Sequence, residues 1–437
     1  MAHEATRVLV VGGGAAGVIT TAALLRAADA ARPVAVTLVE RDAVVGPGLA
    51  YGTTEPIHLL NNYASRMSAL EHDPDHLVRW CRGQGLDVDG ASFVPRATYG
   101  DYLVHLLDDV EVPVGSSVTR VRDEVVDVTD AGTEYLASTR AGAVLTADAV
   151  VLALGNPRPR RPRDLDVPAG RLVADPWDPA LLDRVADGDR VLLVGTGLTT
   201  VDVAAQLGAH RPAARMTAVS RHGLLPLRHV PEPPGPAGSF DAEVEGLGRV
   251  LGEARRCLDD GADWRRVVES VKSAGNDLWR ALGPDDRDRF VRHVARYWEI
   301  ARHRMAPAMA DLVDDLLASG RLTIARAGSV APADFDVVVC CTGPAPVSST
   351  GWSPLVDSLA LQGMLWPSSL GLGVDVDPDG ALLDADGRRG RAIFAVGAAR
   401  RGAEWEVAAV PDLRRQAVRL ADVLRTSYDE PPATLIG

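Results

Sequence analysis

Residues 7–17 of the chain read Arg7-Val-Leu-Val-Val-Gly-Gly-Gly-Ala-Ala-Gly17, a short apolar run that ends in a glycine turn. An Ala/Leu-rich stretch follows to about residue 31, and a second apolar run covers residues 34–40. Strand, glycine turn, helix and strand in this order are typical of a βαβ unit with the pattern G-x-G-x-x-G. The stretch therefore predicts a site for the diphosphate of a dinucleotide.

The three glycines of the G-x-G-x-x-G pattern each have a physical role. Gly12 allows the sharp turn, Gly14 lets the backbone approach a pyrophosphate, and Gly17 lets the helix pack closely on the strand. Ala15 and Ala16 begin the helix, whose N-terminus attracts negative charge. The second strand ends at an acid that can accept hydrogen bonds from ribose hydroxyls, and this acid is Glu40.

A second opening of the same kind begins at residue 190 and reads Arg190-Val-Leu-Leu-Val-Gly-Thr-Gly-Leu-Thr-Thr200. The turn residues expected to contact a dinucleotide are Gly195, Gly197, Leu198 and Thr199. The next apolar run ends in Ser220-Arg221, which places a cation where the first unit has an acid. A cation there fits a ribose 2′-phosphate, so the sequence favours NADP over NAD. The alternatives are that Arg221 is solvated or stacks on adenine.

Other segments complete two Rossmann-like domains. Apolar runs end in glycine at Gly155, Gly343 and Gly397, and a helix is expected from about Pro411. A proline-rich break over 231–236 precedes a stretch to about residue 320 in which apolar residues recur every three or four positions. This pattern predicts an inserted helical cap within the second domain.

Composition narrows the function. The 437 residues hold 46 Lys and Arg against 59 Asp and Glu, a net charge of −13 that disfavours a nucleic-acid partner. The single lysine, Lys272, leaves little room for lysine chemistry. Four cysteines without a Cys-x-x-Cys argue against a zinc ribbon or a redox dithiol, and we expect no metal. Without a signal peptide or an 18–20-residue apolar run, we expect a cytoplasmic protein that does not enter membranes.

Further motifs carry a family resemblance: Gly46-Pro-Gly-Leu-Ala-Tyr51, His58-Leu-Leu-Asn61, Arg66-Met67-Ser68, Asp73-Pro-Asp-His76, Arg302-His-Arg304, Cys341-Thr-Gly-Pro344, and Trp405-Glu406 followed by Ala409-Val-Pro411. With the two glycine turns, they make the chain resemble the FAD/NAD(P)-binding oxidoreductase family of two-domain flavoproteins, near class B flavin monooxygenases and N-hydroxylases. The resemblance implies an α/β fold with FAD in the first site and NADP(H) in the second.

The resemblance also implies domain boundaries. The FAD-binding domain is expected to be discontinuous, with a first part over 1–163 and a second part over 346–437. The NAD(P)-binding domain is expected over 164–231 and 321–345, and the helical cap over 232–320.

Site residues follow from the matched motifs. Beside the two turns, the resemblance implies cofactor contacts at Gly48, Tyr51, His58, Met67, Gly343, Gly397, Trp405, Glu406 and Pro411. Asn61 and Asn62 are expected beside the flavin as catalytic residues, although an ordinary asparagine turn is the alternative. Among His76, His222 and His303, the expected acid–base group is His303, and Arg302 or Arg304 is expected to bind a substrate carboxylate.

The implied reaction is hydroxylation of nitrogen or sulfur in a small polar substrate by molecular oxygen, through a flavin C4a-(hydro)peroxide. Baeyer–Villiger chemistry is not expected, because the stretch over 171–177 lacks the histidine of that fingerprint. One alternative is an NAD(P)H-dependent reductase or dehydrogenase without oxygen insertion. Another is a nucleotide-binding regulatory protein. The sequence leaves open whether the chain forms a homo-oligomer.

Overall fold

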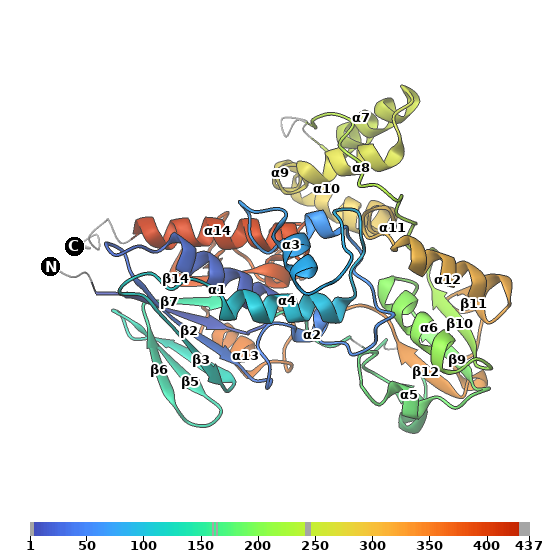
Figure 1. Ribbon diagram of the computed structural model, residues 1–437, viewed down its shortest axis with the longest axis horizontal. Coiled ribbons are helices and arrows are strands. Elements are labelled where there is room, and N and C mark those ends of the chain that lie inside the picture. The colour runs from blue at the N-terminus through green and yellow to red at the C-terminus, as the bar shows by residue number, and fades with distance from the viewer. Residues whose placement is uncertain (1–3, 160, 163–164, 241–245, 428–437) are drawn as a thin grey trace.

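The computed structural model describes residues 4–159, 161–162, 165–240 and 246–427 (Figure 1). It contains two sheet-based domains side by side and a group of helices above the junction between them. The expected boundary between the first two domains, at 163–164, lies outside the described residues.

The first domain is built on a six-stranded sheet in the order β13-β14-β7-β1-β2-β3, parallel except for β13. Its central strands are apolar on both faces, as expected for a parallel sheet covered on both sides. The strands are β1 (Thr6–Val11), β2 (Val34–Glu40), β3 (Ser117–Arg122), β7 (Ala149–Leu152), β13 (Ala381–Leu383) and β14 (Arg389–Ala395).

The C-terminal part of the chain completes this domain. Strand β14 pairs with β7, with Phe394 opposite Val151. The last helix, α14 (Val410–Ser427), packs beside α1 (Ala15–Ala27), and Leu420 and Ala417 lie in the same core as Val18 and Leu25. The predicted discontinuous architecture of this domain is therefore confirmed.

The remaining elements of the first domain surround the sheet. A small antiparallel sheet and four helices contribute to it. They are β4 (Val125–Asp130), β5 (Tyr135–Thr139), β6 (Val144–Ala147), α2 (Gly48–Tyr51), α3 (His76–Gly83), α4 (Arg96–Asp108) and α13 (Pro354–Leu361).

The second domain has a parallel five-stranded sheet in the order β11-β10-β9-β12-β8. Its elements are β8 (Leu172–Val173), α5 (Leu181–Arg184), β9 (Arg190–Val194), α6 (Leu198–His210), β10 (Arg215–Ser220), α12 (Pro307–Ala318), β11 (Leu322–Arg326) and β12 (Val337–Cys340). Met309 and Val313 of α12 share a core with Val201 and Leu207 of α6. Helix α12 thus packs as part of this sheet domain, although the sequence grouped it with the cap.

The insertion between β10 and α12 consists of helices, as the sequence predicted. They are α7 (Leu247–Asp259), α8 (Trp264–Ser273), α9 (Gly275–Ala281), α10 (Pro284–Arg289), a π-helical turn (Phe290–Val294) and α11 (Ala295–Arg302). The two ends of the insertion are joined by backbone hydrogen bonds: His229 N donates to Met305 O (2.9 Å), and Met305 N donates to Leu227 O (2.8 Å).

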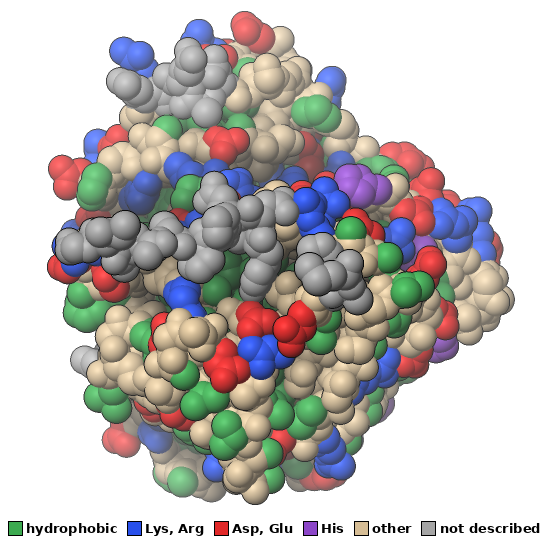
Figure 2. All heavy atoms as spheres, turned by 90° about the vertical axis from the view of Figure 1, so that its left-hand side faces the viewer, with side chains coloured by type: hydrophobic (Ala, Val, Ile, Leu, Met, Phe, Trp, Pro, Cys, Tyr) green, Lys and Arg blue, Asp and Glu red, His purple; other side chains and the backbone are tan. Residues whose placement is uncertain are grey.

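The described surface is of mixed character. Figure 2, which faces the side of the molecule where the termini lie, shows acidic and basic side chains interspersed with apolar ones. Within the described ranges, no helix is long and apolar enough to cross a bilayer.

Leu420→Ala tests whether α14 is part of the hydrophobic core of the first domain. Leu420 is 1% exposed, so we expect the substitution to reduce the free energy of unfolding by roughly 2–5 kcal/mol, measured by urea unfolding followed by circular dichroism. Leu361→Ala is the control, because that side chain is 89% exposed and should change the value by less than about 0.5 kcal/mol. Equal effects of the two substitutions would contradict the assignment.

Candidate functional site

The first glycine turn has the shape of a diphosphate cradle. Gly12 has φ +103°, and a Cβ there would lie 2.4 Å from the carbonyl oxygen of Ala153. A Cβ on Gly17 would lie 1.9 Å from Gly12 O, so helix α1 can pack this closely only with glycine. Gly14 caps α1 without a side-chain hydrogen bond, and no acid lies in the first turn. The free N–H groups and the positive end of the helix fit an anionic diphosphate.

The loop after β2 closes against this turn. Glu40 accepts hydrogen bonds from Gly13 N (2.6 Å) and Asp42 N (2.9 Å), so its carboxylate lies directly beside the glycines. A Cβ on Gly48 would lie 3.0 Å from Gly14 Cα. Tyr51, in the same α2 turn, packs against Tyr99 with ring centroids 4.6 Å apart. The structure therefore brings Gly48 to the first turn.

The C-terminal segment reaches the same place. A Cβ on Gly397 would lie 3.6 Å from Ala16 Cβ, and Gly397 N donates to Gln416 Oε1 (2.8 Å). Pro411 lies in the first turn of α14. Gly397 is thus adjacent to the start of α1.

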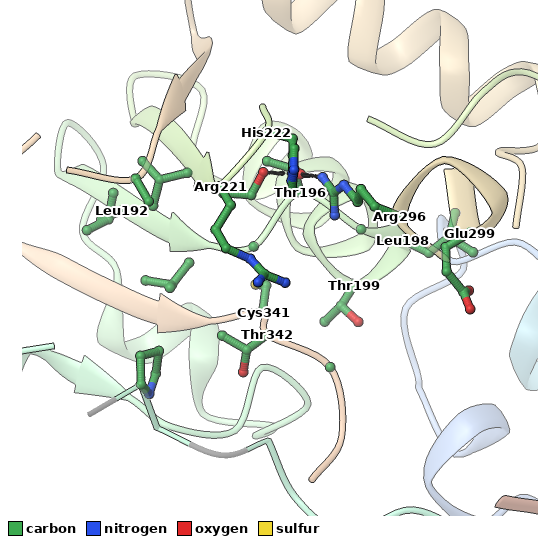
Figure 3. Close-up of a pocket in the computed structure, with 18 of the residues that line it drawn as sticks. Leu192, Thr196, Leu198, Thr199, Arg221, His222, Arg296, Glu299, Cys341 and Thr342 are labelled. Atoms are coloured by element: carbon green, nitrogen blue, oxygen red, sulfur yellow. Dashed lines mark hydrogen bonds between the residues drawn. The ribbon is translucent and has the colours of Figure 1, made fainter. Parts of the chain in front are cut away.

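The second glycine turn opens into a cavity of about 930 Å³ (Figure 3). Gly195 has φ +133°, and its Cβ would lie 2.1 Å from Cys341 O, whereas a Cβ on Gly197 would meet nothing within 4 Å. The cavity is lined by the residues that the sequence assigned to the second turn and the following strand end, namely Gly195, Gly197, Leu198, Thr199, Ser220 and Arg221. Gly343, expected as a cofactor contact, also lines it. The volume suits a small-molecule or cofactor ligand.

A cluster of hydroxyls and arginines lies at the carboxyl end of β10. Thr196 Oγ1 lies 2.9 Å from Ser220 Oγ and 2.7 Å from Leu224 O. Arg296, from the inserted helix α11, donates from Nη2 to Thr196 Oγ1 (3.1 Å), Ser220 Oγ (3.3 Å) and Leu224 O (3.1 Å). Figure 3 shows Arg221 extending into the cavity from the same end of the strand.

One face of α11 lines the cavity. Arg296, Glu299, Ile300 and His303 are spaced three and four residues apart and all contribute to its wall. Glu299 Oε2 lies 3.0 Å from His303 Nε2, and Glu299 Oε1 accepts from Arg401 Nη2 (2.7 Å). Burial would raise the pKa of Glu299, but His303 and Arg401 outweigh it and hold that pKa well below its usual range.

The other face of α11 contacts the first domain. Glu406 accepts from Trp298 Nε1 (3.0 Å) and from Arg302 Nε (2.8 Å). Arg302 Nη2 lies 3.9 Å from Asp412 Oδ2, and neither atom has a hydrogen-bond partner among the described residues. Burial raises the pKa of Asp412, and Arg302 opposes that shift. Trp405 packs under the cap against Trp279 and Phe290.

Arg302, Glu406 and Asp412 form one buried charge cluster, and Arg304 belongs to a second one. Its Nη2 donates to Glu269, which also accepts from Arg66 Nη1 (2.8 Å) and lies 3.7 Å from Lys272 Nζ. Burial, followed by repulsion from Arg302, lowers the pKa of Lys272 to about 8. Arg304 Nε and Nη1 are buried without a hydrogen-bond partner in the described part of the chain.

A buried ion pair joins the two sheet domains. Arg96 of α4 lies 2.7 Å from Asp202 of α6, between Nη2 and Oδ2. His58 Nε2 lies 3.2 Å from the carbonyl oxygen of Asp202, and His58 Nδ1 lies 2.9 Å from Thr53 Oγ1. Burial lowers the pKa of His58. His58, expected to contact cofactor, thus lies in the contact between the domains.

The loop that contains Asn61 and Asn62, the asparagine loop, is hydrogen-bonded to the second domain. His229 Nε2 lies 3.0 Å from the carbonyl oxygen of Asn61, and Asn62 Oδ1 accepts from Tyr63 N (3.1 Å). Met67 is buried in the first core. Burial, followed by repulsion from Arg304, lowers the pKa of His229 to about 3, so this ring is neutral at physiological pH.

Sequence reasoning missed four of these residues: Arg296, Arg96, Asp202 and His229. Asp202 carried a usable signal, because it is the one charged residue in the apolar opening of a helix after a glycine turn. Arg296 could have been found from His303, since the two share one helix face. Arg96 and His229 carry no local signal, because only the tertiary fold brings them to their partners.

Comparison with known proteins finds a family model that matches the N-terminal part of the first domain. Residues 9–157 match the model of a family described as FAD-NAD(P)-binding. This stretch contains the first glycine turn, Glu40 and the asparagine loop. It confirms the resemblance drawn from the sequence. A search of curated protein sequences returned no match.

Solved structures show the same fold over almost the whole chain. An L-lysine 6-monooxygenase from Pseudomonas syringae aligns with TM-score 0.62 and 16% identity, covering 95% of this chain and 98% of that one. An ornithine N-hydroxylase from Kutzneria sp. 744, solved with reduced FAD, NADP⁺ and ornithine, aligns with TM-score 0.61 and 17% identity, covering 97% and 99%. A bacillithiol disulfide reductase from Bacillus cereus aligns with TM-score 0.53 and 13% identity, covering 97% and 100%.

These findings confirm the predicted α/β fold, and the matched family model agrees with the prediction of FAD and a nicotinamide dinucleotide. The two glycine turns described above each fit the diphosphate of a dinucleotide. The roles assigned to individual residues remain predictions.

Two glycine substitutions separate folding from binding at the second turn. Gly195→Ala forces a Cβ against Cys341 O at an unfavourable φ, so we expect a loss of at least about 2 kcal/mol in unfolding free energy. Gly197→Ala should leave the melting temperature within a few degrees but weaken NADP⁺ binding, because its Cβ enters the open cavity. Melting curves and calorimetric titration measure both; a Gly197→Ala variant that binds NADP⁺ normally contradicts the placement.

His229 predicts a pH dependence of stability. Its pKa falls from 6.5 to about 3 on folding, so only the unfolded chain takes up this proton between these values. The contribution of His229 to the free energy of unfolding is therefore fully present above pH 6.5 and is lost as the pH falls toward 3. His229→Gln keeps a donor for Asn61 O without titrating, so urea midpoints should fall less steeply between pH 7 and 5 than in the wild type. If the urea midpoints of the variant and the wild type fall equally steeply with pH, this prediction is wrong.

Proposed function

We propose that the protein is an FAD-dependent, NADPH-using monooxygenase that hydroxylates nitrogen or sulfur of a small polar substrate. The observation that carries the proposal is the pair of buried charge clusters where the cap meets the first domain. They hold hydrogen-bonding atoms of Arg302, Arg304 and Asp412 that have no partner among the described residues. Buried polar atoms of this kind are costly unless a ligand satisfies them.

The charges favour a substrate with both an acid and a basic or soft group. Arg302 Nη2 and Arg304 Nη1 can donate to a carboxylate, as the sequence resemblance implies. Asp412 Oδ2, 3.9 Å from Arg302 Nη2, can accept from an ammonium group. An amino-acid-like molecule offers both kinds of group. The neighbours that act on lysine and ornithine share this whole fold, which supports the proposal.

In this mechanism FAD, when bound, accepts hydride from NADPH and activates oxygen. The glycine turns and helix starts hold the two diphosphates, and α11 separates the second cavity from the charge clusters. His303 Nε2 lies 3.0 Å from Glu299 Oε2 at the wall of the cavity, and its proposed role is to hold or move a proton there. Asn61 and Asn62 are proposed to contact the flavin from a loop that His229 fixes.

The alternative is a reductase without oxygen insertion, since a disulfide reductase also shares the fold. The cysteines speak against disulfide chemistry. Cys81, Cys340 and Cys341 are buried, and burial raises the pKa of the Cys341 thiol to about 12. Buried thiols with a raised pKa are poor nucleophiles. The fourth cysteine, Cys257, lies on α7 in the cap.

Labelled oxygen distinguishes the two functions. The flavin-loaded protein is incubated with NADPH, ¹⁸O₂ and a panel of small amino acids that bear a side-chain amine or thioether. We expect one compound to gain one ¹⁸O atom, detected by mass spectrometry, with NADPH consumed in equal amount. Hydrogen peroxide formed in equal amount with NADPH consumption, with no labelled product across the panel, would overturn the monooxygenase in favour of the reductase.

A further inference from the structure

Two arginines meet at the second cavity without a described counter-ion. Arg296 donates only to neutral oxygens, those of Thr196, Ser220 and Leu224. Arg221 lines the same cavity, and among the described residues no carboxylate pairs with it or with Arg296. Glu299, the acid among the described residues that line the cavity, is already paired with His303 and Arg401. Two cations in one partly buried place call for an anion.

The surroundings of Arg296 disfavour its positive charge. Burial, followed by repulsion from Arg221, lowers the pKa of the Arg296 guanidinium. Its Nε is buried without a hydrogen-bond partner in the described residues. Figure 3 shows both arginines on the cavity wall: Arg296 points from α11 to Thr196, and Arg221, just after β10, extends toward Cys341 and Thr342.

The position identifies the anion. In a Rossmann unit the adenosine ribose lies at the carboxyl end of the second strand, which here is Ser220 at the end of β10. Arg296 Nη2 lies 3.3 Å from Ser220 Oγ, so its guanidinium is at the ribose position. A 2′-phosphate carries close to two negative charges and accepts from planar guanidinium groups, whereas a 2′-hydroxyl cannot balance them.

We propose that Arg296, carried by the helical insertion, binds the 2′-phosphate of NADPH together with Arg221, so that the insertion itself distinguishes NADPH from NADH. The inference rests on the proposed function only in assigning NADPH to the second cavity. The π-helical turn at Phe290–Val294 directly precedes α11, and the register of α11 places Arg296 on the cavity face. The opposite face of α11 holds Glu406, so the helix that binds the phosphate also forms the contact with the first domain.

The test uses two probes that differ only in the phosphate, 2′,5′-ADP and 5′-AMP, titrated calorimetrically into the flavin-loaded full chain. Arg296→Gln keeps neutral donors for Thr196 and Leu224 and removes the charge. We expect its Kd for 2′,5′-ADP to rise about tenfold or more, with the Kd for 5′-AMP changed less than about twofold. Arg292→Gln, on an exposed arginine paired with Asp288, is the matched control and should change neither value.

Several outcomes overturn the inference. Unchanged binding of 2′,5′-ADP by Arg296→Gln does so, and so does an equal loss for both probes, which indicates a purely structural role. A melting temperature within a few degrees of the wild type confirms that Arg296→Gln is folded. If Arg296→Gln is less stable than that, Arg296→Lys, which keeps the positive charge, should recover part of the preference for 2′,5′-ADP over 5′-AMP. A wild type that binds both probes equally refutes this inference alone. Selective 2′,5′-ADP binding without ¹⁸O incorporation supports it while refuting the monooxygenase.

Discussion

One backbone contact, made twice, determines the architecture of this molecule. In each sheet domain a glycine at positive φ lies against the carbonyl of the residue that follows a neighbouring parallel strand: Gly12 against Ala153 and Gly195 against Cys341. No side chain fits at either place. The contact sets where each first strand ends and where each helix begins, and so it places the free N–H groups of two helix starts at the carboxyl ends of the sheets.

The relative position of the two starts depends on charge burial at the junction. Arg96 and Asp202 form an ion pair between the domains, with Asp202 3% exposed. Removing one partner would leave the other charge buried and unpaired, which is costly. Helix α11 adds a second connection, because its two faces contact the second cavity and Glu406. The insertion therefore connects this cavity to the C-terminal part of the first domain.

Local patterns in the sequence were enough for both glycine turns, the order of the elements and the completion of the first domain by the C-terminal segment. These features depend on backbone conformation and on apolar periodicity, which are readable over 10–20 residues. The partners of single polar side chains were not readable in this way. Trp405, expected beside the flavin, packs with Trp279 and Phe290, and Arg302, expected to bind substrate, already donates to Glu406. Each of these contacts joins segments more than 100 residues apart.

The closed base of the insertion has a consequence for exchanging this segment. Because residues 227–229 and Met305 are joined by backbone hydrogen bonds, the chain leaves and re-enters the second domain at adjacent points. Exchanging the segment between them would keep these two points and replace the side chains that contact Thr196 and Glu406. Transplanting the corresponding segment from a relative, cut at these two points, offers a direct route to chimeric enzymes with altered selectivity.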